Sequence, residues 1–202
     1  MSQPVRADSG PREGRNMAWR ADDEVRAMFD QVGENVLVST RAVFYEPEKM
    51  RIGDNSRIDD FCLLSGSVSV GRNVHLTAYT HIAGGAPGVV LGDFSTCAYG
   101  CHILTQSDDY SGLTMANSTV PRRFKNESFA AVRIGKHAIL GTGTIVLPGC
   151  DVGDGVSTGA GTVVTKPLEE WTIYVGQPAK AVGPRSKQLL KLEADFLREG
   201  GA

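Results

Sequence analysis

Residues 134–166 read IGKHAILGTGTIVLPGCDVGDGVSTGAGTVVTK, and a branched side chain returns at every sixth position of this stretch. The same step recurs earlier in the chain. The positions it joins are Val32, Val38 and Phe44; Ile52, Ile58, Leu64, Val70, Leu76 and Ile82; Leu91, Cys97 and Ile103; and Ile134, Leu140, Val146, Val152, Thr158 and Val164. Fifteen of these 18 positions are Val, Ile or Leu, so the repeat predicts an inward-facing column.

A six-residue step does not suit a helix, because six residues at about 100° each carry successive positions around the helix axis. It does suit a short strand followed by a turn. Three such units close a triangular coil of 18 residues, with coil starts at 52, 70, 91, 134 and 152. Three extra residues fall near 83–90 and 25 near 108–132. The sequence therefore predicts an all-β solenoid of stacked coils.

The repeat resembles that of the left-handed β-helix, hexapeptide-repeat acyltransferases. The stretches IGDNSRIDD, VGRNVHL, LGDFSTCAYGCHI, the run at 134–166 and YVGQPAKAV carry the resemblance, which covers roughly residues 32–183. The left hand of the expected parallel β-helix is implied by this resemblance alone.

The segments outside the repeat predict a tail and two helices. Residues 1–16 are rich in Pro, Gly, Arg and Ser, which is typical of a flexible tail. Residues 17–31 are expected to form a helix that caps the first coil, because an open coil end exposes unpaired strand edges. Residues 184–202 carry Leu189, Leu190, Leu192 and Phe196 at helical spacing and predict a C-terminal helix.

Composition narrows the function classes. The net charge is −2, which disfavours nucleic acid as a partner, and no apolar run approaches the length of a membrane span. Without an apolar signal segment near the start, a cytoplasmic location is expected. The cysteines at 62, 97, 101 and 150 fall on inward positions and lack metal-ligand spacing, so we expect buried thiols.

The break at 108–132, DDYSGLTMANSTVPRRFKNESFAAV, is where function is expected, because a regular coil has no pocket of its own. It is either a harmless surface excursion or an arm that walls a site on a neighbouring subunit. In the second case Tyr110, Arg122 and Arg123 would face the substrate. The resemblance implies homotrimers with active sites between adjacent subunits.

The motifs TQSDDYSG and NSTVP are similar to a subgroup associated with O-antigen sugar pathways, in which some relatives N-acetylate nucleotide-linked 3-amino or 4-amino deoxysugars. The galactoside and xenobiotic acetyltransferase branch begins the equivalent loop with a catalytic His. Here that position is Asp108, a weaker base. An amine substrate needs less help from a base than a hydroxyl does.

The candidates for proton handling are Asp108, Asp109, His102 and His81. The two histidines occupy equivalent hexad positions on successive coils and are expected to stack at one corner. They are either an oriented base or simple solvated corner residues. A third ligand that would make them a zinc site is not evident, so no metal is expected.

For the acyl donor, the resemblance implies acetyl-CoA in a cleft along the later coils. Gly141 would offer its N–H to the thioester carbonyl, and Ala160 would contact the pantetheine. Thr165, Lys166 and Lys180 would complete the site, with the lysines neutralising phosphate and Arg185 as a substitute. The glycine and alanine also fit the repeat, and the lysines also fit ordinary solvated charge.

We therefore expect an acetyl-CoA-dependent acyltransferase that N-acetylates a nucleotide-linked amino deoxysugar for surface polysaccharide, such as lipopolysaccharide. The main alternative is a sugar O-acetyltransferase of the galactoside type. A zinc carbonic-anhydrase-like protein and a non-catalytic scaffold are more distant alternatives.

Overall fold

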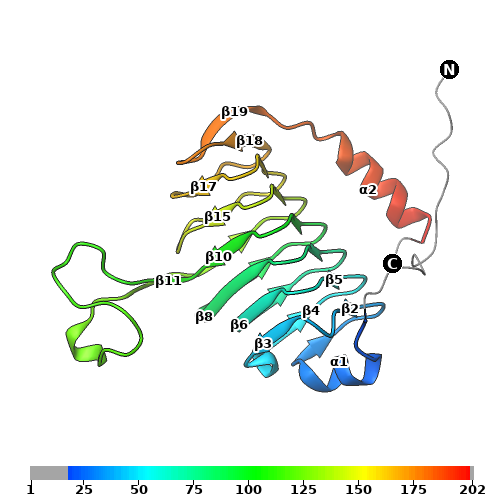
Figure 1. The fold of residues 1–202 in the computed structure, drawn as a ribbon. Coiled ribbons are helices and arrows are strands. Elements are labelled where there is room, and N and C mark those ends of the chain that lie inside the picture. The colour runs from blue at the N-terminus through cyan, green and yellow to red at the C-terminus, as the bar shows by residue number, and fades with distance from the viewer. Residues whose placement is uncertain (1–17, 201–202) are drawn as a thin grey trace.

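The computed structural model describes residues 18–200, so the tail expected at residues 1–16 lies outside the described part. The chain is a β-solenoid of about seven turns and matches the left-handed β-helix of hexapeptide repeats that was predicted (Figure 1). Two α-helices accompany the coils, α1 (Asp22–Met28) at one end and α2 (Gln188–Arg198) along one side.

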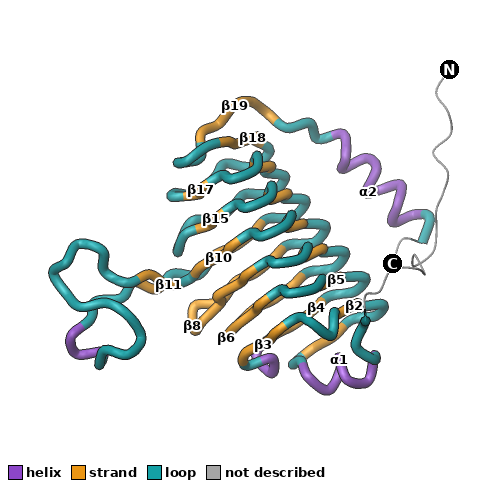
Figure 2. The backbone as a smooth tube through the Cα atoms, in the orientation of Figure 1, coloured by secondary structure: helices purple, strands orange, loops and turns teal. Residues whose placement is uncertain are grey.

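Strands of two or three residues, joined by turns, make up most of the coils (Figure 2). Within residues 18–200, the first sheet contains β1 (Gln31–Val32), β3 (Val43–Tyr45), β4 (Met50–Ile52), β6 (Leu63–Val70), β8 (His81–Leu91), β10 (His102–Leu104), β13 (Val132–Ile134), β15 (Ile145–Val146) and β17 (Val163–Val164). The second sheet contains β2 (Leu37–Val38), β5 (Arg57–Ile58), β7 (His75–Leu76), β9 (Thr96–Cys97), β14 (Ile139–Leu140), β16 (Ser157–Thr158), β18 (Thr172–Val175) and β19 (Lys180–Pro184). A separate antiparallel pair joins β11 (Gln106–Ser107) to β12 (Ser128–Phe129). Short 3-10 helices lie at Pro47–Lys49 and Arg122–Phe124.

The predicted coil starts pair with one another in register. Ile52 pairs with Val70, Val70 with Leu91, and Leu91 with Ile134. The three extra residues near 83–90 are absorbed by register shifts between β6 and β8. The early series also forms a coil, and the 3-10 turn at Pro47–Lys49 lengthens it.

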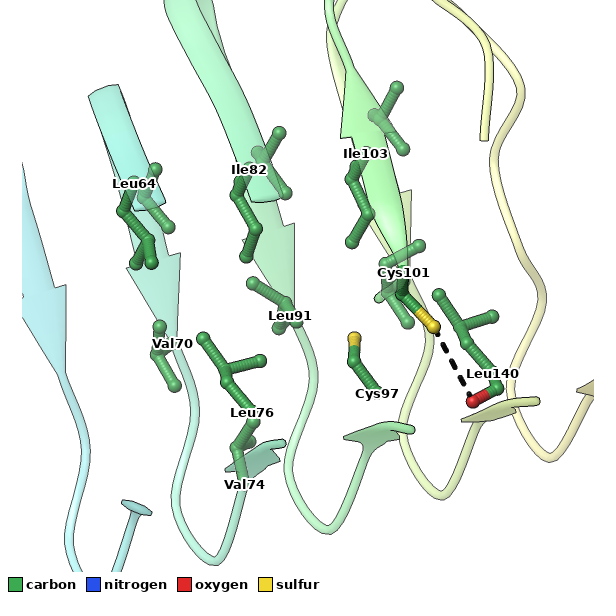
Figure 3. Close-up of a cluster of buried hydrophobic side chains, with 14 of the residues drawn as sticks. Leu64, Val70, Val74, Leu76, Ile82, Leu91, Cys97, Cys101, Ile103 and Leu140 are labelled. Atoms are coloured by element: carbon green, nitrogen blue, oxygen red, sulfur yellow. Dashed lines mark hydrogen bonds between the residues drawn. The ribbon is translucent and has the colours of Figure 1, made fainter. Parts of the chain in front are cut away.

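The inward positions form a continuous core. Of the 18 repeat positions, all are buried except Val32 and Phe44, which are partly buried and pack against the core. Figure 3 shows Leu64, Ile82 and Ile103 following one another from coil to coil. The buried side chains of successive coils form one hydrophobic cluster, as expected of a closely packed interior.

The four cysteines are free and buried, as predicted. Burial raises the pKa of the Cys62 thiol to about 12 and that of Cys101 to about 11. Such thiols stay protonated at neutral pH and are poor nucleophiles. They therefore act as small apolar side chains in the core.

The N-terminal helix is shorter than the 17–31 predicted. Trp19 forms an antiparallel bridge with Ser39, and the chain becomes helical only at Asp22. It leaves the helix at Phe29, which is buried, and the N–H of Asp30 then donates to a backbone carbonyl of the next coil, that of Met50. At both ends of the segment 17–31, backbone pairing with the first coils therefore replaces the predicted helix.

The C-terminal helix is present but spans only 188–198, and it lies against the side of the solenoid. Its Glu193 accepts hydrogen bonds from the ammonium of Lys136 at 2.6 Å and from Nε2 of His137 at 2.8 Å. The ring of Phe196 meets Phe94 edge to face, and Phe94 stacks on His137. These contacts fasten α2 to two successive coils and give His137 a structural role.

Candidate active site on the solenoid

The two predicted histidines lie together. His81 opens β8 and His102 opens β10, and the two residues are register partners. Their ring centroids are 5.6 Å apart at 86°. Burial, and then the charge of His102, lower the pKa of His81, which keeps it neutral at pH 7.

The pair lies in an otherwise apolar outward column. Leu63 pairs with His81 on the coil before, and Ile145 pairs with His102 on the coil after. A neutral imidazole in such a column can accept or donate one proton, so the pair is chemically competent as a base.

The two aspartates lie at the root of the arm that follows β11. Asp109 accepts hydrogen bonds from the N–H of Ser111 at 2.8 Å, and from the N–H and hydroxyl of Thr114 at 3.1 and 2.8 Å. Hydrogen bonds from Ser111 and Thr114 lower the pKa of Asp109 to about 2. This carboxylate is therefore a weak base and organises the arm.

Asp108 is less constrained. One of its carboxylate oxygens accepts a single long hydrogen bond, 3.3 Å, from the N–H of Asn117. Of the two aspartates, Asp108 has more capacity left to accept a proton or a substrate amine.

The arm holds the predicted substrate-facing residues away from their own coils. Figure 1 shows it extending outward from β11 on the side opposite α2. Tyr110 is 92% exposed at its start. The guanidinium of Arg122 lies over the ring of Phe129 at 5.8 Å, and that of Arg123 over Phe124 at 4.6 Å. The arm thus presents cations and aromatic rings outward.

The N–H of Gly141, predicted to meet the thioester carbonyl, already has partners within the coils. That N–H donates to the carbonyl of Thr158 at 3.1 Å and to its hydroxyl at 3.0 Å, so it is not free for a thioester. Gly141 is needed for packing instead, because a Cβ there would lie 2.5 Å from the Thr158 carbonyl oxygen. By contrast, the N–H of Ala160 finds no acceptor in residues 18–200.

The remaining predicted residues lie at the last coils. Thr165 and Lys166 are exposed after β17, and Lys180 is exposed at the start of β19. The N–H of Ala179 donates to the carbonyl of Val163, which places Lys180 at the same end of the solenoid.

Arg185 cannot substitute for these lysines as was suggested. Its Nη1 donates to the carbonyls of His137, Gly155 and Val156 at 2.7, 3.1 and 3.2 Å. This guanidinium group joins the last coils to the segment that leads into α2.

The sequence analysis did not predict a charged cluster on the second sheet, formed by Arg57, Asp59 and His75. Asp59 accepts hydrogen bonds from Nε of Arg57 at 2.6 Å and from Nε2 of His75 at 3.0 Å. Burial alone would raise the pKa of Asp59, but the hydrogen bonds from His75 and Arg57, and their charges, lower it overall. The only signal in the sequence is an acidic residue directly after Ile58, a place where other coils carry small residues.

Among the described residues, no three or more His, Cys, Asp or Glu gather closely enough to hold a metal ion. In the same part of the chain, no helix is long and apolar enough to cross a membrane.

Comparison with known proteins places this arrangement among transferases. The profile of the bacterial transferase hexapeptide family, with six repeats, matches residues 131–166. The dTDP-4-amino-4,6-dideoxy-D-glucose acyltransferase of Escherichia coli is 39% identical over 184 residues, which is 89% of this chain and 95% of that relative.

Solved structures agree over the whole fold. A mutant of AntD, an N-acyltransferase from Bacillus cereus in complex with dTDP-4-amino-4,6-dideoxyglucose and coenzyme A, superposes with a TM-score of 0.90. It is 36% identical, and the match covers 92% of this chain and 100% of AntD. AntD in complex with dTDP and 3-hydroxybutyryl-CoA gives a TM-score of 0.88 at 36% identity, covering 91% of this chain and 98% of AntD.

Proposed function

Because this chain belongs to the hexapeptide-repeat family of bacterial transferases, we propose that it transfers an acyl group from acyl-CoA to the amino group of a nucleotide-linked 4-amino-4,6-dideoxyhexose. The observation that carries the proposal is the full-length match to AntD, whose structures hold the dTDP-sugar and coenzyme A. The Escherichia coli relative acts on the same class of sugar by its name. Acetyl-CoA is our choice of donor, and AntD with bound 3-hydroxybutyryl-CoA makes a longer acyl group the alternative.

The reaction transfers the acyl group from the thioester sulfur of acyl-CoA to the amine nitrogen of the sugar. The neutral amine attacks the thioester carbonyl carbon and forms a C–N bond, and the carbonyl oxygen becomes an oxyanion. The free N–H of Ala160 is one available donor for that oxyanion. Collapse of the intermediate breaks the C–S bond and yields the amide and the CoA thiolate.

The surplus proton of the amine needs an acceptor. Asp108, with its spare hydrogen-bonding capacity, is our first candidate, and His102 with the neutral His81 is the second. Asp109 is third, because its low pKa makes it the weakest base of the set. The departing thiolate takes the proton if none of these groups does.

The later coils suit the pantetheine and phosphates of acyl-CoA. Gly141 and Ala160 have little or no side chain on the coil surface, which lets a ligand approach the backbone. Thr165, Lys166 and Lys180 are exposed at the end of the same stack, where the lysines can neutralise phosphate.

We propose that the working assembly is a homotrimer, because the arm carries Tyr110, Arg122 and Arg123 away from the coils of its own chain. A neighbouring subunit brings these residues to a shared site. We place the reaction in the cytoplasm, where acyl-CoA and nucleotide sugars are available, and the product in surface polysaccharide, including lipopolysaccharide.

The test is the release of free CoA thiol from acetyl-CoA and from 3-hydroxybutyryl-CoA. The acceptors are dTDP-linked 4-amino and 3-amino deoxysugars, each beside the sugar with a hydroxyl at the same carbon. Rapid turnover with an amino sugar alone supports the proposal. Turnover with hydroxyl sugars alone would overturn it in favour of O-acetylation, and absence of any CoA binding would favour a scaffold.

A further inference from the structure

One corner of the solenoid repeats the same backbone geometry in five successive coils. It follows the second-sheet strands, and we call it the second-sheet corner. Its residues, with their φ angles, are Phe61 (60°), Tyr79 (66°), Gly100 (64°), Gly143 (70°) and Gly161 (68°).

Backbone hydrogen bonds show that these corner positions are equivalent. The N–H of Tyr79 donates to the carbonyl of Asp60, and that of Gly100 to the carbonyl of Ala78, at 3.2 and 3.1 Å. In each case the acceptor is the residue just before the corner on the preceding coil. The N–H groups at 143 and 161 follow the same rule.

The lower part of the corner is a stack of exposed aromatic rings. The centroids of Phe61 and Tyr79 are 5.1 Å apart with 21° between their planes, and the two residues are 49% and 60% exposed. The guanidinium of Arg41 lies over Phe61 at 6.0 Å and is held by Asp60 at 2.7 Å. Bulky residues seldom adopt positive φ, and glycine serves on the coils above.

The aromatic stack ends at Gly100, where no side chain of residues 18–200 covers the next position; we call the space over Gly100, beside the ring of Tyr79, the open step. Apart from its chain neighbours, no atom lies within 4 Å of a Cβ built on Gly100. Tyr99 beside it is 60% exposed, and within the described residues its ring does not contact that of Tyr79. The face of Tyr79 that looks toward Gly100 therefore has no ring upon it.

The other corner of the same coils shows what a glycine step can hold. At Gly155, the equivalent position after the first-sheet strands, the ring of Trp171 fills the space, with Cδ2 2.5 Å from a Cβ built there. A glycine at a corner of this solenoid thus makes room for one aromatic ring.

Resting on the proposed function, we infer that the open step over Gly100 binds the pyrimidine base of the nucleotide sugar, stacked on Tyr79. The step lies two residues before His102, so a base there would place the sugar toward the histidine pair and the root of the arm. We favour the pyrimidine over the adenine of CoA, because the proposed function puts the CoA phosphates at Lys166 and Lys180, at the far end of the stack.

The test is calorimetric titration of the full-length protein with dTDP, with pyrophosphate and with CoA. The main variant is Tyr79→Gly, because glycine already occupies three equivalent corners and suits the local φ. Loss of the ring should raise the Kd for dTDP about 10-fold, the size typical of one base–aromatic stack. The Kd values for pyrophosphate and CoA should not change.

Two matched variants complete the design. Tyr79→Phe keeps the ring and should bind dTDP within about 2-fold of the wild type. Gly100→Phe places a ring in the open step, as Phe61 and Tyr79 do at the same φ, and should weaken dTDP binding about as much as Tyr79→Gly.

Three results would overturn the inference while leaving the proposed function standing. The first is an unchanged Kd for dTDP in both Tyr79→Gly and Gly100→Phe. The second is weaker CoA binding instead, which would assign the step to adenine. The third is a change of assembly mass in sedimentation, which would make this corner a contact between subunits. A wild type that binds no dTDP and turns over no amino sugar would instead remove the proposed function itself.

Discussion

Replacing Asp59 by Asn removes the charge at the centre of the cluster beside the second-sheet corner. The side chain is 9% exposed, and its two oxygens accept hydrogen bonds from Arg57 and His75. Asparagine has nearly the same shape, so the change takes away charge without opening a cavity. The expected result is a less stable fold with the same core.

The decrease in unfolding free energy can be estimated from how exposed Arg57 and His75 are. A hydrogen bond to a charged group contributes about 1.5–3 kcal/mol, which would suggest about 3–6 kcal/mol for two. The side chains of Arg57 and His75 are 40% and 41% exposed, so water replaces much of what each loses. We therefore expect about 2 kcal/mol and a Tm lower by roughly 4–8 °C.

The loss depends on pH in a defined direction. Because the pKa of Asp59 is lower in the folded state, its contribution is fully present above the unfolded value of about 3.9. It disappears as the pH falls through the folded value. The gap between wild type and Asp59→Asn should therefore persist from pH 5 to 7 and close in acid, at pH values below about 4.

Urea unfolding at several pH values measures this gap. Asp30→Asn is the matched control, because Asp30 and Arg51 are 2.7 Å apart, close to the 2.6 Å between Asp59 and Arg57, but their side chains are 46% and 62% exposed. That exposed pair should contribute less than about 1 kcal/mol. Equal losses in the two variants, or a gap for Asp59→Asn that persists unchanged at pH 3, would refute the reasoning from burial.

Three further variants test other parts of the structure. Glu193→Gln should speed hydrogen–deuterium exchange in α2 and lower the free energy of unfolding by about 1 kcal/mol at pH 7. Burial alone would raise the pKa of Glu193, but hydrogen bonds from Lys136 and His137 outweigh burial and lower it. The effect of the substitution should therefore fade below about pH 4. Gly141→Ala puts a Cβ against the backbone of the next coil and should lower the free energy of unfolding in urea by about 1–3 kcal/mol. Gly100→Ala meets open space around its Cβ and should lower it by only about 1 kcal/mol, from backbone strain. Asp109→Asn should raise the KM for the sugar more than it lowers kcat, since the carboxylate shapes the arm; a loss confined to kcat would make Asp109 the base.

The hexad made the inward half of the fold predictable. Each coil start, the extra residues near 83–90 and the stacking of His81 on His102 follow from counting in sixes, because parallel coils hold residues in fixed register. The same arithmetic placed all four cysteines in the core.

The outward half was less predictable, because the repeat fixes which residues point out but not what they contact. Asp59 meets His75 across 16 residues through the rotamers of both side chains. The N–H of Gly141 was assigned to a ligand because the coil bond to Thr158 leaves no mark in the sequence. Helix α1 is short because Trp19 and Asp30 find partners on other coils.

The arm shows why function can be added to such a fold at little cost. Leu91 and Ile134 are in register although they are separated by 25 residues more than a regular coil contains. Lengthening a loop from 18 to 43 residues adds less than about 1 kcal/mol of closure entropy, because that cost grows only with the logarithm of length. The buried columns above and below are untouched, since β13 pairs with β8 as though the arm were absent. Corner residues such as Tyr79 and Gly100 are equally independent of the core. The coils therefore supply stability and spacing, and the arm and the corners can change in sequence without disturbing the buried core.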